Sequence, residues 1–196
     1  MAPTVPEFYA GKSVLITGGT GFVGKALLEK LLRCCPDIGT VYLLMRQKKG
    51  LGCEERLKDL WSKRVFDLLR DKDPEAIKKV RLINGDITEP ELGISDADKK
   101  ELQERCNVIF HSAACVRFDQ KLKDAVFNLN TTGTLRMLTL AESMKNLQVF
   151  VHLSTAYCRC DLEMLEEKLY PAVHNPRKII EIVEWMDDDT LQYLEP

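Results

Sequence analysis

The chain has 196 residues, 45% of them hydrophobic and 30% charged, a balance typical of a soluble globular domain. Its net charge of −2 argues against a protein that binds nucleic acid through a basic surface. No apolar run approaches the roughly 20 residues of a membrane span, and the first residues lack the basic and apolar regions of a secretory signal. The seven cysteines fit plain thiols in a reducing compartment better than a disulfide framework or a metal site.

Five short apolar runs predict the strands of a parallel sheet. They are rich in valine, isoleucine, leucine and aromatic residues, and several are apolar throughout, as in strands that are covered on both faces. In chain order the runs are 13–17, 40–45, 80–84, 107–113 and 148–154.

Between these runs, apolar residues at helical spacing predict helices at 22–35, 53–70 and 119–143. The apolar stripes are Ala26, Leu27, Leu31 and Cys34 in the first helix, Leu57, Leu60, Trp61, Val65 and Leu68 in the second, and Leu122, Val126, Leu129, Gly133, Met137 and Leu140 in the third. The alternation of strands and helices predicts right-handed crossovers and an α/β fold with a doubly wound parallel sheet.

A single domain is expected over residues 1–196, with the sheet formed by about 10–160 and a helical or loop tail at 161–196. In the tail, Pro171 and Pro176 break the helix-like pieces, and no further strand is predicted. Because a complete fold of this type normally has a sixth strand, we expect the sheet to be incomplete at its C-terminal end.

A glycine-rich turn, TGGTGFVG (17–24), links the first strand to the first helix. Gly18 permits a tight turn, Gly21 lets a pyrophosphate approach the backbone, and Gly24 lets the helix pack close to the strand. The helix N-terminus offers N–H groups to an anion. The turn predicts a nicotinamide dinucleotide site; a flavin or other ligand on the same fold, or a turn without a ligand, are the alternatives. The residues expected to bind the cofactor here are Gly18, Thr20, Gly21, Phe22, Val23 and Gly24.

The end of the second strand favours NADP(H) over NAD(H). An NAD site places an acidic residue there for the ribose hydroxyls, whereas this chain has Arg46, with Lys48 and Lys49 just beyond. The guanidinium fork of Arg46 suits bidentate contact with a 2′-phosphate. The alternative is a solvated basic turn.

The third and fourth strands end in residues that suit an adenine nucleotide. Asp86 can accept a hydrogen bond from the adenine amino group, and Ile87 can pack on the ring. Ala113 and Ala114 end the fourth strand, where small side chains leave room for the dinucleotide. His111 precedes the carboxyl edge of that strand, so it is interpreted as a packing or hydrogen-bonding histidine rather than an acid–base residue.

The motifs TGGTGFVG, GDIT, HSAA, NLNTTGT and HLSTAY together resemble the extended short-chain dehydrogenase/reductase superfamily, whose fold is Rossmann-like. The stretches VIFHSAACVRFD, MKNLQVFVHLSTAYCRC and EWMDDD are similar to the alcohol-forming fatty acyl-CoA reductases of animals. This resemblance runs from about Tyr9 to Asp188, and no function is attached to its departure at CRC (158–160). It implies that a long-chain acyl-CoA is reduced to a primary alcohol by two NADPH hydrides, through an aldehyde.

The resemblance also implies catalytic roles. The hydroxyl that holds the carbonyl in this superfamily maps to Thr155, with Ser154 as the second choice. Asn130 matches the superfamily's structural asparagine; alternatively, it is a mid-helix asparagine bonded to backbone. The catalytic Tyr-x-x-x-Lys pair is absent, because no tyrosine of the sequence is followed four residues on by a lysine; after Tyr157 that position is Asp161. The 196-residue chain by itself is therefore expected to be inactive.

Two other interpretations are open: another extended short-chain reductase or epimerase, and a non-catalytic fragment or isoform that at most binds nucleotide or a partner. The tail EEKLYPAVHNPRKIIEIVEWMDDD favours the acyl-CoA family over the epimerases. Full-length relatives are anchored to the peroxisomal membrane by C-terminal segments. The resemblance thus implies the cytosolic face of that membrane, through segments that this sequence does not contain. It indicates no oligomeric state and no chain-length preference.

Overall fold

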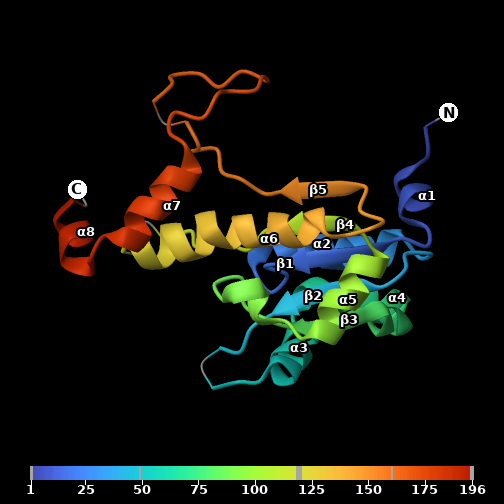
Figure 1. Ribbon diagram of the computed structural model, residues 1–196. Helices are drawn as coiled ribbons and strands as arrows, with labels where there is room; N and C mark the ends of the chain where they lie inside the picture. The colour runs from blue at the N-terminus through green and yellow to red at the C-terminus, as the bar shows by residue number, and fades with distance from the viewer. Residues whose placement is uncertain (1, 49, 118–120, 160, 195–196) are drawn as a thin grey trace.

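The computed structural model describes residues 2–48, 50–117, 121–159 and 161–194 and contains a five-stranded parallel sheet in the order β3-β2-β1-β4-β5 (Figure 1). The strands are β1 (Ser13–Thr17), β2 (Val41–Met45), β3 (Val80–Asn84), β4 (Cys106–His111) and β5 (Val149–His152). The chain winds outward from β1 to β3 and then continues on the other side of β1 through β4 to β5. The expected doubly wound α/β fold is confirmed.

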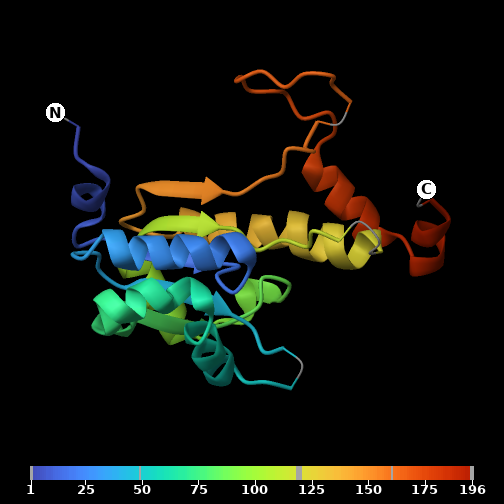
Figure 2. The same ribbon diagram turned by 180° about the vertical axis from the view of Figure 1, so that it is seen from behind.

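Helices cover both faces of the sheet, which explains why the central strands are apolar throughout. Successive side chains of a strand point to opposite faces, so Val14 packs in one core with α2 (Phe22–Cys34) while Leu15 packs in another. The second core includes Met137 of α6 (Thr132–Glu142). Figures 1 and 2, which differ by a half turn, show α2 and α6 on opposite faces. The first predicted helix, 22–35, corresponds to α2.

The prediction of one helix at 53–70 is wrong. The segment forms α3 (Cys53–Trp61), a 3-10 turn (Arg64–Phe66) and α4 (Asp67–Lys72). The break shifts the phase of the apolar stripe, so Val65 and Leu68, which were expected in the core, are 39% and 45% exposed. Phe66 and Leu69 are fully buried in their place.

The predicted helix at 119–143 is a π-helix, Leu122–Thr131, followed by α6. Gly133, Met137 and Leu140 are buried as expected, and Leu129 packs against the same core. Residues 119 and 120 and the side chains of Leu122 and Val126 lie outside the described part of the structure.

Two helices were not predicted, α1 (Val5–Tyr9) and α5 (Asp96–Arg105). Hydrophobic periodicity misses α5 because it is mostly charged, with Leu102 its buried residue. The start of α5 nevertheless carries a local signal: the Ser95 hydroxyl accepts a hydrogen bond from the Asp98 amide at 3.1 Å, as an N-cap does. Further 3-10 turns lie at Pro74–Lys79 and Pro90–Gly93.

Beyond β5 the chain makes an excursion away from the sheet and returns as α7 (Pro176–Trp185) and α8 (Asp188–Leu194) (Figure 1). Pro176 does not break a helix, as was predicted, but begins α7, where a missing N–H costs no hydrogen bond. An ion pair between Lys123 and Asp188 links the π-helix to α8. Among the described residues no strand follows β5, and none of their helices has the length and apolar character of a membrane span.

Candidate functional site

Three glycines at and just after the turn between β1 and α2, Gly18, Gly21 and Gly24, differ in what a side chain would meet. Gly18 has a φ of +70°, and a β-carbon there would lie 2.6 Å from the backbone carbonyl of Ser112. At Gly24 it would lie 2.3 Å from the Gly18 oxygen. At Gly21, with a φ of −74°, it would meet only that same oxygen, at 3.1 Å. The fold therefore requires Gly18 and Gly24, whereas the space over Gly21 is open to a ligand.

A first hollow of about 220 Å³ lies beside this turn, where the carboxyl ends of β1, β2 and β3 meet the segment after β4. The first turn of α2 has no side-chain cap, so its N–H groups are available to an anion. Phe22, Val23 and Gly24 do not line the first hollow; Phe22 is 89% exposed, and Val23 lines a second hollow. The predicted cofactor residues that do line it are Gly18, Thr20, Gly21, Arg46, Lys48, Asp86, Ile87 and Ala113.

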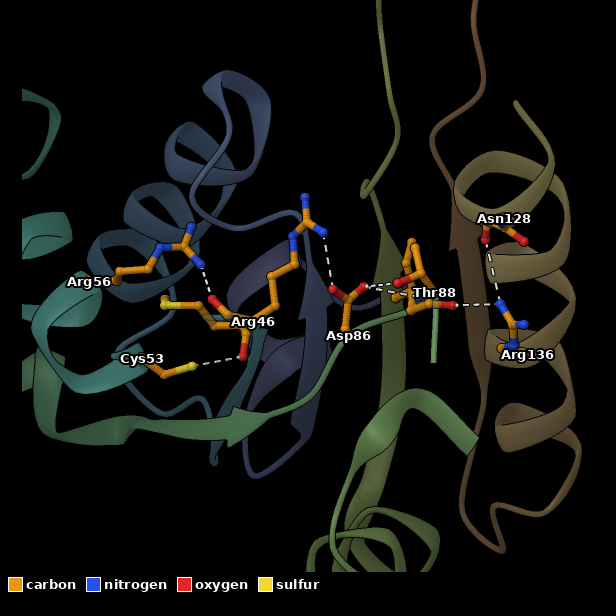
Figure 3. Close-up of polar contacts among 9 residues, drawn as sticks. Arg46, Cys53, Arg56, Asp86, Thr88, Asn128 and Arg136 are labelled. Carbon is orange, nitrogen blue, oxygen red and sulfur yellow. Dashed lines mark hydrogen bonds and ion pairs between the residues drawn. The ribbon is translucent and has the colours of Figure 1, made fainter. Parts of the chain in front are cut away.

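Arg46 and Asp86 form an ion pair across the first hollow, with 3.0 Å between Arg46 Nη1 and Asp86 Oδ2 (Figure 3). The other carboxylate oxygen accepts hydrogen bonds from the Thr88 amide at 3.0 Å and hydroxyl at 2.8 Å. Burial alone raises the pKa of Asp86, but the bonds from Thr88 and Arg46 outweigh it and lower that pKa below its usual value. Asp86 thus stays ionised and orients the half-exposed Arg46 guanidinium.

Arg56 of α3 is a second guanidinium at this hollow, and no sequence motif predicted it. It donates to the Arg46 carbonyl oxygen (Figure 3). Its other terminal nitrogen donates to the Thr20 hydroxyl at 3.2 Å. Arg56 therefore ties the end of β2 to the glycine turn. The one available signal was its place on the charged side of the predicted 53–70 helix, which does not distinguish it from a solvated arginine. Lys49 of the predicted basic turn lies outside the described residues.

His111 is completely buried at the end of β4, which stops two residues before the predicted strand end. Its Nδ1 lies 2.7 Å from the Thr17 hydroxyl and its Nε2 lies 3.1 Å from the Thr134 hydroxyl. Burial, with a smaller contribution from His152, lowers the pKa of His111 from 6.5 to about 4. The interpretation as a packing and hydrogen-bonding histidine is in keeping with these contacts.

We expect the neutral state of His111 to make the fold acid-sensitive. Because the pKa of His111 is lower in the folded state, the unfolded chain binds more protons between pH 6.5 and about 4. The free energy of unfolding should be unaffected by His111 above pH 6.5 and should fall as the pH drops through that window, by on the order of 3 kcal/mol. Among the described residues against its ring, Thr17 and Thr134 are uncharged and His152 is titratable.

Denaturant unfolding at pH 7 and pH 4.5 measures this effect. A His111→Asn variant should lose less stability between the two pH values than the wild type. His174, which lies exposed in the tail, provides the control, since His174→Asn should keep the wild-type difference. An unchanged pH dependence in His111→Asn would contradict the assignment.

The second hollow has a volume of about 570 Å³ and adjoins the first. Ser112, Ala113 and Ala114, which follow β4, line both hollows. The remaining residues of the second hollow come from α2, the segment after β4, the π-helix, α6, the end of β5 and the segment after it; they are Val23, Cys115, Val116, Asn130, Thr134, His152, Leu153, Ser154, Thr155 and Tyr157. Cys160 of the CRC stretch lies outside the described residues.

Thr155 and Ser154 lie side by side on the exposed segment after β5. The Thr155 hydroxyl oxygen accepts a hydrogen bond from the Tyr157 amide at 3.2 Å, and the Thr155 carbonyl accepts one from the Cys158 amide at 3.3 Å. The turn fixes the hydroxyl oxygen and leaves its proton for a ligand in the second hollow.

Asn130, at the C-terminal end of the π-helix, clamps the backbone of Cys115. Its side-chain oxygen accepts from the Cys115 amide at 2.8 Å, and its side-chain nitrogen donates to the Cys115 carbonyl at 3.0 Å. The asparagine is thus bonded to backbone, but to a segment distant in sequence rather than to its own helix. Asn130 fixes one wall of the second hollow.

A doubly wound parallel sheet with a glycine turn, and with a basic hollow at the carboxyl ends of its strands, defines a Rossmann-like domain for a nicotinamide dinucleotide. The family described as male sterility protein, an NAD-binding family, matches residues 16–194, and the chain belongs to it.

Relatives named as fatty acyl-CoA reductases are similar over almost the whole chain. Fatty acyl-CoA reductase 1 of Homo sapiens is 47% identical over 193 residues, which cover 98% of this chain and 37% of the relative. A putative fatty acyl-CoA reductase of Drosophila melanogaster is also 47% identical over 193 residues, with the same coverage. The chain thus spans little more than a third of the length of these relatives.

Solved reductases share the fold. The reductase domain of a non-ribosomal peptide synthetase from Mycobacterium tuberculosis is 29% identical with a TM-score of 0.64, covering 83% of this chain and 37% of that chain. Yeast methylglyoxal/isovaleraldehyde reductase, complexed with NADPH, is 16% identical with a TM-score of 0.52, covering 71% of this chain and 36% of that chain. At that identity the second likeness concerns the fold alone.

Proposed function

We propose that this chain is the cofactor-binding part of an NADPH-dependent reductase that converts long-chain fatty acyl-CoA to fatty alcohol. The observation that carries the proposal is the wall shared by the two hollows, Ser112 to Ala114, which puts a ligand in one hollow next to a ligand in the other. The similarity to fatty acyl-CoA reductases supports the choice of substrate.

The residues of the first hollow fit NADPH. The open space over Gly21 and the uncapped start of α2 suit the pyrophosphate. Arg46, Arg56 and Lys48 place three cations around the same hollow, which suits a 2′-phosphate better than a free ribose hydroxyl. Asp86 and Ile87 are assigned to the adenine, although both carboxylate oxygens of Asp86 already accept hydrogen bonds, one from Arg46 and the other from Thr88.

The second hollow supplies a donor for the charge that develops during reduction. NADPH provides the hydride. As the carbonyl carbon gains it, the carbonyl oxygen becomes negative and requires a hydrogen-bond donor. We assign this role to the Thr155 hydroxyl, whose oxygen is held by the Tyr157 amide while its proton is free to donate. Ser154 is the second choice. The sequence contains no Tyr-x-x-x-Lys pair, so no proton transfer is assigned to its residues.

From the resemblance to the fatty acyl-CoA reductases of animals, we propose that the full-length protein acts at the cytosolic face of the peroxisomal membrane. The fatty acyl chain is insoluble in water, which suits an enzyme held at a lipid surface. Targeted imaging of the tagged full-length protein tests this location, and a uniform cytosolic distribution would contradict it.

The activity is tested with the purified full-length protein, NADPH and palmitoyl-CoA. NADPH absorbance should fall only when acyl-CoA is present, and two NADPH should be consumed for each fatty alcohol found by mass spectrometry. Tight NADPH binding without any acyl-CoA-dependent oxidation would contradict the proposed substrate while leaving the cofactor assignment intact.

Arg46 should select the 2′-phosphate. Loss of a charge-assisted hydrogen bond costs roughly 1.5–3 kcal/mol, so Arg46→Ala should raise the dissociation constant of NADPH about ten- to a hundredfold. The dissociation constant of NADH, which lacks that phosphate, should change little. Fluorescence titration of both cofactors measures the difference.

Two variants sharpen this test. Arg46→Lys keeps the charge but loses the planar fork, so its NADPH affinity should lie between those of wild type and Arg46→Ala. Arg33, which pairs with Glu29 on α2 and does not line the first hollow, provides the control; Arg33→Ala should leave both affinities unchanged. Equal losses of NADPH and NADH in Arg46→Ala would remove Arg46 from this role.

A further inference from the structure

His111 belongs to an unbroken series of hydrogen bonds that joins the two hollows. On one side its Nδ1 meets Thr17 Oγ1 at 2.7 Å, and that hydroxyl accepts from the Ala113 amide at 3.2 Å. On the other side its Nε2 meets Thr134 Oγ1 at 3.1 Å, and that hydroxyl donates to the Asn130 carbonyl at 2.7 Å. The series therefore begins at a backbone N–H and ends at a backbone C=O.

The Asn130 end of the series fixes the directions of its bonds. A hydroxyl has one proton, and Thr134 gives it to the Asn130 carbonyl, so Thr134 accepts from His111 Nε2. Burial keeps the His111 ring neutral near pH 7, so Nδ1 then carries no proton and accepts from the Thr17 hydroxyl, which itself accepts from the Ala113 amide. The series is complete when the His111 ring is neutral with its proton on Nε2.

The segment 112–115, called the wall segment below, is held by the partners that His111 connects. At its start the Ser112 hydroxyl donates to the Thr17 carbonyl at 2.6 Å, and the Ala113 amide bonds to the Thr17 side chain. At its end Cys115 is clamped by both atoms of the Asn130 amide group. The His111 side chain contacts Thr17 at the start of the wall segment and, through Thr134, reaches Asn130 at its end.

We propose that His111, as the neutral Nε2–H tautomer, is a positioning residue that holds the wall segment in one conformation for both hollows. Its effects on binding and turnover rest on the proposed function, whereas its effect on the order of the wall segment does not. The ring suits this role because it offers an acceptor on one edge and a donor on another, at a fixed distance, which neither a hydroxyl nor an apolar side chain provides.

Three substitutions at His111 separate its two bonds. Asparagine places its oxygen near the position of Nδ1, so His111→Asn keeps an acceptor for Thr17 and loses the donor to Thr134. Glutamine reaches the position of Nε2, so His111→Gln keeps the donor and loses the acceptor. His111→Phe fills the space and makes neither bond.

Hydrogen–deuterium exchange of the wall segment in the full-length protein measures the result without reference to activity. In His111→Phe the Ala113 and Cys115 amides should both exchange about tenfold faster, the effect of one lost neutral hydrogen bond. In His111→Asn the exchange rate of the Cys115 amide should rise more than that of the Ala113 amide. In His111→Gln the exchange rate of the Ala113 amide should rise more. NADPH affinity should fall in the variants in which the Ala113 amide exchanges faster. The kcat should fall in the variants in which the Cys115 amide exchanges faster.

Thr134→Val should reproduce the exchange pattern of His111→Asn. Thr139 offers a matched control on the same helix, because its hydroxyl bonds the Leu135 carbonyl four residues back and has no contact with His111 in the structure. Thr139→Val should leave the wall segment unchanged.

Wild-type exchange in His111→Phe, or identical patterns in all three His111 variants, would overturn the positioning role. The first result would make His111 a space-filling residue, and the second would make it a residue that supports the fold as a whole. If the wild-type protein fails to bind NADPH, the proposed function fails, but the exchange pattern still decides what His111 does.

Discussion

Gly21→Val should abolish NADPH binding and leave the fold intact. The backbone of Gly21, with φ −74° and ψ 178°, suits any residue, and an added β-carbon meets only the Gly18 oxygen at 3.1 Å. A shift of a few tenths of an ångström relieves that contact. The branched side chain then projects into the open space where a pyrophosphate must approach the backbone.

Gly52 provides an unusually close control for this substitution. It also precedes the first residue of a helix, with φ −66° and ψ 161°, and a β-carbon there has the Glu55 carboxylate as its nearest neighbour, at 4.0 Å. Gly52→Val should therefore carry the same loss of glycine flexibility without touching the first hollow.

Far-UV circular dichroism and fluorescence titration with NADPH, applied to both variants, decide the outcome. Near wild-type binding in Gly21→Val would show that the phosphate-loop assignment is wrong. Loss of the folded spectrum is instead expected for Gly24→Val, whose β-carbon would lie 2.3 Å from a backbone oxygen.

Where the sequence predicted the fold well, the local pattern and the packing agree. The strand at 13–17 is apolar because helices cover both of its faces, and the structure places it at Ser13–Thr17. The prediction of one helix at 53–70 was wrong because there the local pattern and the packing disagree. Its apolar residues fit a single continuous stripe, but the chain breaks after Trp61 and uses Phe66 and Leu69 as core residues. Periodicity alone does not report a break that restarts the stripe in another phase.

The candidate site shows the same division. The glycine turn and the residues that end the strands were predictable because the ends of parallel strands meet at one edge. Two contacts of the site were not predictable: Arg46 pairs with Asp86, 40 residues away, and Arg56 donates to the Thr20 hydroxyl. Both depend on the positions that α3 and the turns take in the folded chain. No spacing rule encodes such contacts. The role of Asn130 was likewise open, because only the folded chain brings Cys115 against it.

Thr155→Val should lower kcat about 10²–10³-fold in the full-length enzyme, the usual effect of losing one donor to a developing oxyanion. The affinity for NADPH should be kept, because Thr155 lines the second hollow and not the first. Valine has nearly the shape of threonine, so the change removes the hydroxyl and little else. Single-turnover kinetics with palmitoyl-CoA, together with NADPH titration, separate the two quantities.

The neighbouring residues make this prediction specific. Thr155→Ser keeps a hydroxyl that can accept from the Tyr157 amide and donate to the substrate, so it should recover most of the lost activity. Ser154→Ala should reduce kcat much less than Thr155→Val. If Ser154→Ala has the larger effect, the donor is Ser154, and the bond between the Tyr157 amide and the Thr155 hydroxyl serves only to shape the turn. A parallel fall in NADPH affinity for Thr155→Val would instead show that the segment after β5 also holds the cofactor.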